Sequence, residues 1–169
     1  MTAPVVMHRR LFLAEAQGLA VELSEEAAAQ IISACQRAGR IETGGILIGH
    51  YNARHDTAVI VEALSQPEDS HAGPSWFQRG IAGVEAALRA RWSRTPRLYY
   101  LGEWHYHPKA SADPSGADLQ QMAAIAGDRG YRCPEPILMI LGGDPQGNPP
   151  LSVTVIRRGG SRVRLLEQP

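Results

Sequence analysis

Apolar side chains recur at helical spacing in the segment LSEEAAAQIISACQRAGR, residues 23–40. Four of them fall at the i, i+3, i+4 and i+7 positions: Ala28, Ile31, Ile32 and Cys35. This spacing predicts a helix that packs one stripe on a core. Ser24 is placed to cap its first turn, and arginines near its end are favourable to the helix dipole.

Continuous or alternating apolar runs predict strands through the middle and the end of the chain. The runs are GGILIGHY (44–51), TAVIVEAL (57–64), RLYYLGEWHYHP (97–108), PILMILG (136–142), LSVTVIR (151–157) and SRVRLL (161–166). A short polar stretch separates the first two, and two glycines separate the last two. Each of these two pairs is therefore expected to form an antiparallel hairpin.

Between these strands the pattern predicts a surface loop and two more helices. The loop is SQPEDSHAGPS (65–75), which could cover a site, and PSGADLQQMAAIAG (114–127) is the later helix. The earlier helix is marked by Phe77, Ile81, Val84 and Leu88. The order helix, two strands, helix, strand, helix, three strands predicts an α+β fold with a mixed β-sheet flanked by helices, and residues 1–169 are expected to form one domain.

The charge balance narrows the partners. Lys plus Arg and Asp plus Glu each number 17, so the formal net charge is zero. Without a global field to attract a phosphate backbone or an anionic lipid surface, we expect neither a nucleic acid nor a membrane as partner. Arginines at 89, 91, 94 and 97 form a local basic run, which is either a solvated face or a surface for an acidic partner.

The cysteine usage and the N-terminal residues favour a cytoplasmic location. Cys35 and Cys133 are too far apart in sequence to suggest a ligand pair or a disulfide framework, which suits a reducing compartment. MTAPVVMHRR lacks the basic-then-apolar order of a signal peptide. No apolar run reaches the ~18 residues of a membrane span.

The stretch WHYHPKASADPSGAD, residues 104–118, carries the candidate chemistry. In a strand, His105 and His107 share one face with Cα atoms about 6.5–7 Å apart, so their imidazoles can converge on one ion. Glu103 is on the same face but ~13 Å from His107, so we assign it a supporting role. Asp118 falls in the first turn of the following helix, where the helix dipole favours the ionised carboxylate.

Two histidines, one aspartate and a water make the open tetrahedral set of a catalytic zinc. Simpler interpretations exist for each half. Ser115 and Asp118 also fit a capping box, and an H-x-H pair is common on a solvent-facing strand. The capping box leaves the two preceding histidines without a role, and a cap can also orient a ligand.

The spacing H-x-H-x7-S-x2-D from His105 to Asp118 resembles the signature of the JAMM (JAB/MPN) metalloproteases, and Ile41-Glu42-Thr43-Gly44-Gly45 resembles their upstream glutamate segment. GEWHYHP with PSGADL is similar to stand-alone prokaryotic members. The resemblance implies a cytidine-deaminase-like three-layer fold and one Zn²⁺ per chain. It also implies roles for five residues: His105, His107 and Asp118 as zinc ligands, Glu42 as general base and acid, and Ser115 as oxyanion stabiliser.

The implied reaction is hydrolysis of the peptide or isopeptide bond after the C-terminal tail of a ubiquitin-like modifier. The expected partners are such a modifier or its conjugate, with activating and conjugating enzymes of the same operon, as in antiphage (antiviral defense) systems. The shortness of the loop at 65–75 argues against a eukaryotic chain-linkage specificity. Two alternatives stay open: a protease that trims a C-terminally extended ubiquitin-like or sulfur-carrier precursor, and a non-catalytic MPN scaffold.

Overall fold

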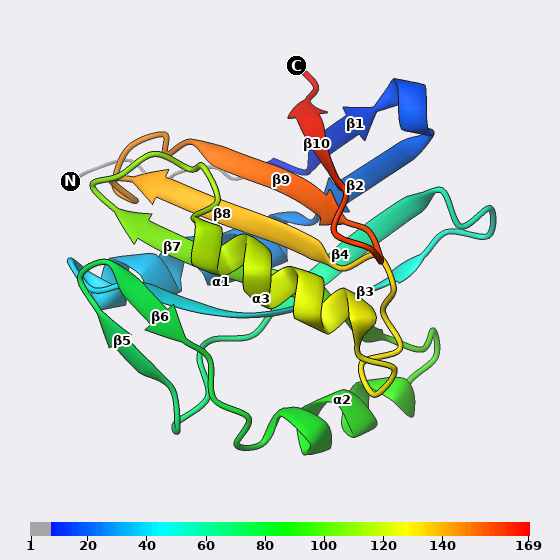
Figure 1. The fold of residues 1–169 in the computed structure, drawn as a ribbon, viewed down its shortest axis with the longest axis horizontal. Helices are drawn as coiled ribbons and strands as arrows, with labels where there is room; N and C mark the ends of the chain where they lie inside the picture. Colours follow the sequence, from blue (N-terminus) through cyan, green and yellow to red (C-terminus); the bar gives the residue numbers. More distant parts are fainter. Residues whose placement is uncertain (1–7) are drawn as a thin grey trace.

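A computed structural model describes residues 8–169, in which eight strands close into a barrel (Figure 1). Around the barrel the order is β1, β10, β9, β8, β7, β3, β4 and β2. Their bounds are Arg10–Ala14 (β1), Leu19–Leu23 (β2), Thr43–Tyr51 (β3), Thr57–Ala63 (β4), Tyr99–Pro108 (β7), Ile137–Gly143 (β8), Leu151–Ile156 (β9) and Arg162–Glu167 (β10). Pairs β2–β4 and β7–β8 are parallel and the others antiparallel, which confirms a mixed sheet in an α+β fold.

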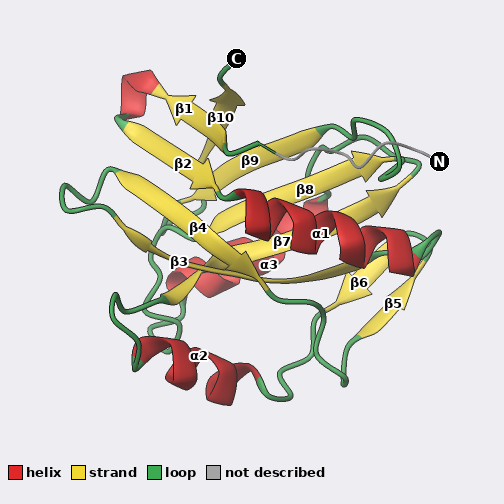
Figure 2. Ribbon diagram, turned by 180° about the vertical axis from the view of Figure 1, so that it is seen from behind, coloured by secondary structure: helices red, strands yellow, loops and turns green. Residues whose placement is uncertain are grey.

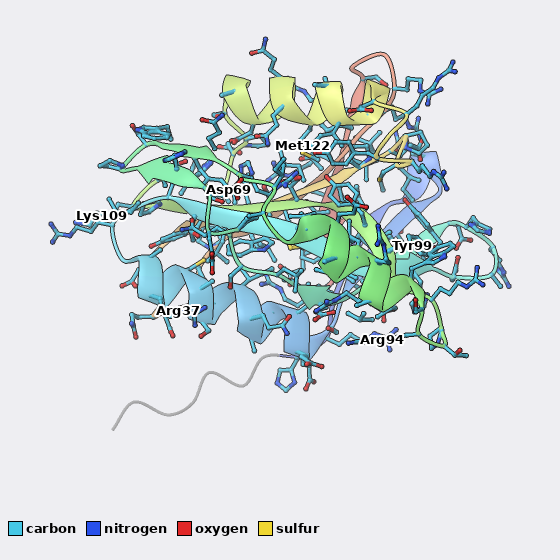
Figure 3. The ribbon with its side chains drawn as sticks, turned by 90° about the horizontal axis from the view of Figure 1, so that it is seen from below. Arg37, Asp69, Arg94, Tyr99, Lys109 and Met122 are labelled. Atoms are coloured by element: carbon cyan, nitrogen blue, oxygen red, sulfur yellow. The ribbon has the colours of Figure 1, made fainter. Side chains whose placement is uncertain are left out.

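Two helices cover opposite faces of the sheet, α1 (Glu25–Ala38) and α3 (Gly116–Gly127) (Figure 2). Met122 lies between α3 and the sheet, on the side away from α1 and its Arg37 (Figure 3). Each face carries its own apolar cluster. Along β8, Met139 and Leu141 belong to the α1 cluster and Ile140 to the α3 cluster. Because β8 is buried on both faces, its sequence is a continuous apolar run.

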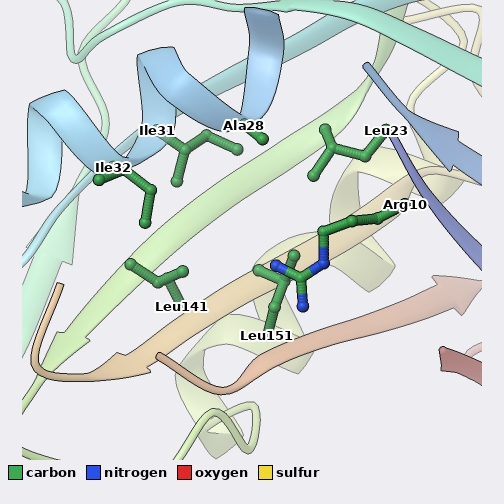
Figure 4. A pocket seen from close by; sticks show the side chains of 7 residues that line it. All are labelled: Arg10, Leu23, Ala28, Ile31, Ile32, Leu141 and Leu151. Carbon is green, nitrogen blue, oxygen red and sulfur yellow. The ribbon is translucent and has the colours of Figure 1, made fainter. Parts of the chain in front are cut away.

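The predicted stripe of α1 is confirmed. Ser24 caps the helix, with its Oγ accepting from the Ala27 amide at 3.1 Å. Ala28, Ile31 and Ile32 face apolar side chains of the barrel, and the gap between them is only about 10 Å³ (Figure 4). Cys35, on the same stripe, is fully buried, and burial raises the pKa of its thiol to about 12. Cys35 is therefore a packing residue, as expected.

The predicted second helix begins too early. The structure starts α2 at Val84 and ends it at Trp92, places Phe77 in a strand, and leaves Ile81 75% exposed. Gly83 adopts a positive φ of 74°, which breaks a helix extended from the earlier residues. The backbone amides of residues 81 and 82 instead donate hydrogen bonds to the carboxylate of Asp69.

Two further features were not predicted. The short strands β1 and β2, joined by a 3₁₀ turn at Glu15–Gln17, complete the sheet as a barrel in place of the open layer that a three-layer fold implies. Their pairing partners, β10 and β4, lie far away in the sequence, so no local pattern reveals them. The predicted surface loop also contains β5 (His71–Gly73), which pairs with β6 (Trp76–Gln78).

No helix within residues 8–169 is long and apolar enough to cross a membrane. Residues 1–7, which include most of the segment predicted to lack a signal peptide, lie outside the described residues.

The packing of α1 gives a test of the core. Ile31→Ala removes a side chain that is 2% exposed and should lower the free energy of unfolding by about 2–5 kcal/mol. The matched change Ile81→Ala should alter it by less than about 0.5 kcal/mol, because Ile81 is exposed. Urea denaturation of both variants checks this. Equal losses would contradict the assignment of the core.

Candidate metal centre

Strand β7 places the two histidines in the middle of the sheet. It pairs with β3 on one side and with β8 on the other, so it is not an edge strand. Trp104 and Tyr106 belong to the α1 cluster, and alternation therefore turns His105 and His107 toward α3. Both imidazoles are buried, 1% and 8% exposed. The alternative of a solvent-facing H-x-H pair is thus wrong.

Asp118 reaches the histidines from the first turn of α3. The capping box forms as its sequence allows: Ser115 Oγ accepts from the Asp118 amide at 3.1 Å, and Asp118 Oδ2 accepts from the Ser115 amide at 2.7 Å. These two bonds fix the carboxylate at the start of the helix. The cap and the contact with the histidines therefore coexist, as anticipated.

The Asp118 carboxylate contacts both imidazoles. Its Oδ1 lies 2.8 Å from His105 Nδ1, and its Oδ2 lies 3.2 Å from His107 Nε2. Burial alone would raise the pKa of Asp118, but the hydrogen bonds from His105 and His107 outweigh it and hold this pKa well below its usual range. The hydrogen bond between His107 and Asp118 raises the pKa of His107, although burial of the imidazole acts in the opposite direction. The carboxylate is therefore ionised, the form that binds a metal.

Within residues 8–169, the Nε2 atom of His105 is buried and has no hydrogen-bond partner. The other ring nitrogen, Nδ1, faces the Asp118 carboxylate, so Nε2 is the imidazole nitrogen that is free to bind a further partner such as a metal ion. In the part of the chain that the structure describes, no group of three or more His, Cys, Asp or Glu side chains already forms a metal-holding arrangement. The donor chemistry and the unpartnered nitrogen nevertheless fit a metal ion held by His105, His107 and Asp118.

Glu42 lies in the turn between α1 and β3 and is half-buried. Burial raises the pKa of its carboxyl; the charge of His107 opposes this rise, and that of Asp118 adds to it. The next residue, Thr43, is the register partner of Tyr106, so Glu42 adjoins the stretch of β7 that carries the two histidines. Its backbone amide donates to the Gly73 carbonyl of β5 at 2.9 Å. Only the family resemblance singled out this glutamate, because a lone Glu in a turn carries no signal of its own.

The predicted supporting role of Glu103 agrees with its contacts. Its carboxylate is fully buried and pairs with the guanidinium of Arg79 at 2.8 Å. Two residues that sequence reasoning did not assign to the site also belong here, Arg79 and Phe77. The ring of Phe77 packs edge-on against His105 with 5.3 Å between centroids. Phe77 was predicted in a helix, and no pattern in the sequence points to this contact.

Comparison with known proteins decides the family. Residues 24–156 match the model of prokaryotic homologues of the JAB domain. The chain belongs to this prokaryotic JAB family. The matched residues include all five positions of the predicted site, from Glu42 to Asp118.

Relatives of this JAB chain are named for peptide-bond hydrolysis. A CD-NTase/cGAS isopeptidase of Enterobacter hormaechei is 47% identical over 92% of the chain and 86% of that protein. A second CD-NTase/cGAS isopeptidase, from Pseudomonas aeruginosa, is 31% identical over 60% of the chain and 63% of its own length. A probable metalloprotease y4qB of Sinorhizobium fredii is 26% identical over 63% of the chain and 65% of its own length. These relatives support a hydrolase of the isopeptidase kind.

A solved structure shares the fold of this chain. The solution structure of protein DSY2949 from Desulfitobacterium hafniense superposes with a TM-score of 0.55 at 21% identity, over 86% of this chain and 88% of the other. At this identity the likeness concerns the fold alone.

Asp118 should separate metal binding from helix capping. We expect Asp118→Ala to weaken the binding of Zn²⁺ by at least about 100-fold, since it removes a charged donor that contacts both histidines. Ser115→Ala is the control: it removes the same cap, lowers stability by about 0.5–2 kcal/mol, and should keep the zinc affinity within a few-fold. Competition with a chromophoric chelator measures both. Wild-type zinc affinity in Asp118→Ala would rule out the ligand set.

Proposed function

We propose that this chain is a zinc-dependent isopeptidase that releases a ubiquitin-like modifier from a target lysine by hydrolysing the bond after the modifier's C-terminal tail. The observation that carries the proposal is the buried cluster in which Asp118 contacts both imidazoles; Glu42 directly precedes Thr43, which pairs with Tyr106 between the two histidines. Family membership and the isopeptidase names of two relatives support it.

His105, His107 and Asp118 would hold the metal. When bound, zinc supplies a Lewis acid that polarises the scissile carbonyl and lowers the pKa of water toward ~7. The buried position of the three side chains limits competition from solvent, which strengthens each electrostatic contact.

Glu42 would move the proton. Its carboxyl accepts a proton from the attacking water and then delivers it to the departing amine, because a lysine amine leaves poorly as an anion. The raised pKa of Glu42 suits both steps, because a carboxyl whose pKa is closer to neutral pH can both accept a proton and return it. No covalent acyl intermediate on the chain is needed.

Ser115 would stabilise the oxyanion that forms on the attacked carbonyl. Its Oγ accepts from the Asp118 amide, so its own hydroxyl proton stays available to donate. The backbone amide of Ser115 is already bonded to Asp118, which keeps the residue fixed. Removing a comparable oxyanion donor costs about 10²–10³ in turnover.

The substrate would present an extended tail. Glycines at the end of such a tail pass a narrow entry because they lack side chains. Relatives named CD-NTase/cGAS isopeptidase suggest that the conjugated target is a protein of that class. Activating and conjugating enzymes of the same operon would be the further partners, in an antiphage conjugation system of the cytoplasm.

Glu42→Gln tests the proposal as a substrate trap in the native cell. The variant should bind one zinc per chain like the wild type but lose at least about 10²-fold in cleavage, because it cannot transfer the proton. Glu85→Gln, an exposed change on α2, is the control and should cleave normally. Mass spectrometry of material captured by Glu42→Gln should show a modifier tail joined to a lysine.

Two outcomes would contradict this account. Cleavage by zinc-free protein, or by Glu42→Gln at the wild-type rate, would exclude the mechanism. Capture of only an unconjugated carrier with extra C-terminal residues would identify a processing protease instead.

A further inference from the structure

The hairpin β5–β6 lies outside the barrel (Figure 1). It contacts the centre at two points. The ring of Phe77 packs against His105, and the Gly73 carbonyl accepts from the Glu42 amide. The fit at Phe77 is close: a Cβ added at Gly44 would lie 2.7 Å from Phe77 Cε1 and 2.9 Å from His105 Cδ2. The hairpin therefore packs against the predicted ligand His105 and hydrogen-bonds the backbone of the predicted base Glu42.

This hairpin is too short to hold itself in place. Each strand has three residues, and within residues 8–169 the two form a ladder with each other and not with a strand of the barrel. An isolated two-stranded hairpin is marginally stable at best in water. Trp76 of this hairpin is 52% exposed, so about half of its side chain stays in water. Something outside the hairpin must fix it to the barrel.

Arg79, the residue directly after β6, makes that connection. Its Nε lies 2.9 and 2.8 Å from the two carboxylate oxygens of Glu103 on β7, and both side chains are buried, 4% and 0% exposed. A second nitrogen donates to the Tyr131 hydroxyl at 3.0 Å, and a third donates to the Gly80 carbonyl at 2.7 Å. The Tyr100 hydroxyl donates to Glu103 at 3.0 Å.

The two ends of this ion pair are close to the site in sequence. Glu103 precedes His105 by two residues on the same strand face, and Arg79 follows Phe77 by two residues. The pair therefore joins the segment that carries the ligand to the segment that packs against it. A buried guanidinium with several fixed hydrogen bonds has few alternative positions, so the register between the two segments is set.

We propose that Arg79 is a positioning residue of the metal centre, which fixes the hairpin so that Phe77 holds the His105 ring and Gly73 holds Glu42. The inference rests on the proposed roles of His105 and Glu42. Without the Arg79–Glu103 pair the hairpin detaches, the His105 imidazole gains rotational freedom, and the turn of Glu42 loses its bond to β5. Metal affinity and proton transfer then fall together.

The chain offers a matched control in a second Arg–Glu pair. Arg91 on α2 binds both carboxylate oxygens of Glu62 on β4, at 2.8 and 2.5 Å, with side chains 17% and 18% exposed. Arg91→Met and Arg79→Met thus each break a two-point ion pair between separate elements. Only the second should affect the metal centre.

Hydrogen exchange and zinc binding test the inference without any substrate. In Arg79→Met, amides of residues 71–78 and of Glu42 should exchange at least about tenfold faster, and Zn²⁺ affinity in chelator competition should fall about 10–100-fold. In Arg91→Met the exchange rates of these amides and the Zn²⁺ affinity should match those of the wild type, even if its melting temperature falls as much as that of Arg79→Met. Arg79→Lys keeps the positive charge but not the planar guanidinium, so its exchange rates and zinc affinity should lie between those of the wild type and Arg79→Met. If Arg79→Met does not fold, Arg79→Lys is compared with Arg91→Lys instead.

Phe77→Ala tests the contact between Phe77 and His105 separately from the Arg79–Glu103 ion pair. It should weaken zinc binding in the same direction while leaving the exchange of the Glu42 amide unchanged, and Trp76→Ala, at a half-exposed side chain of the same hairpin, should do neither. Exchange and zinc affinity that are the same in Arg79→Met and Arg91→Met would overturn the positioning role, even with zinc-dependent cleavage intact in the wild type. Conversely, faster amide exchange and weaker zinc binding in Arg79→Met but not in Arg91→Met would support the positioning role. This holds even if the wild type cleaves no conjugate and the proposed function fails.

Discussion

The carboxylate of Asp118 connects the two elements on which the site depends. It joins the start of α3 to two alternate positions of β7 through contacts of 2.8 and 3.2 Å. It also closes the capping box that begins the helix. One side chain therefore terminates the loop, orients α3 on the sheet, and brings an ionised donor to two buried imidazoles. A change to this carboxylate therefore affects both the start of the helix and the geometry of the site.

The barrel makes this contact possible by burying β7 between β3 and β8. An edge strand would leave its histidines beside water, where carboxylate and imidazole interact weakly. In the closed sheet, one face of β7 packs on α1 through Trp104 and Tyr106, and the other face is left to the polar residues. The buried ion pair of Arg79 and Glu103 continues this polar row at its start. The row is thus enclosed by apolar layers, and each of its charges needs a partner.

Sequence patterns were informative wherever the interaction is local. The alternation of His105 and His107, the cap at Ser115, and the stripe of α1 all follow from neighbours within a few residues. Contacts between distant segments left no such trace. The pairing of β1 and β2 with β10 and β4, which closes the barrel, depends on residues far apart in the chain. The same holds for Phe77 against His105 and for Arg79 with Glu103. Glu42 was found only because the motif resembles a known family, and the assignment of all five site residues, like that of residues 1–169 as one domain, stays a prediction.

The central claim is that this buried cluster is a zinc centre that performs hydrolysis. The most direct measurement is the cleavage of a modifier–lysine conjugate by one protein sample before chelation, after chelation, and after addition of one equivalent of Zn²⁺, with zinc content determined at each stage by elemental analysis. The account predicts one zinc per chain, loss of cleavage with the metal, and recovery on its return. Cleavage that persists in the zinc-free sample would contradict it.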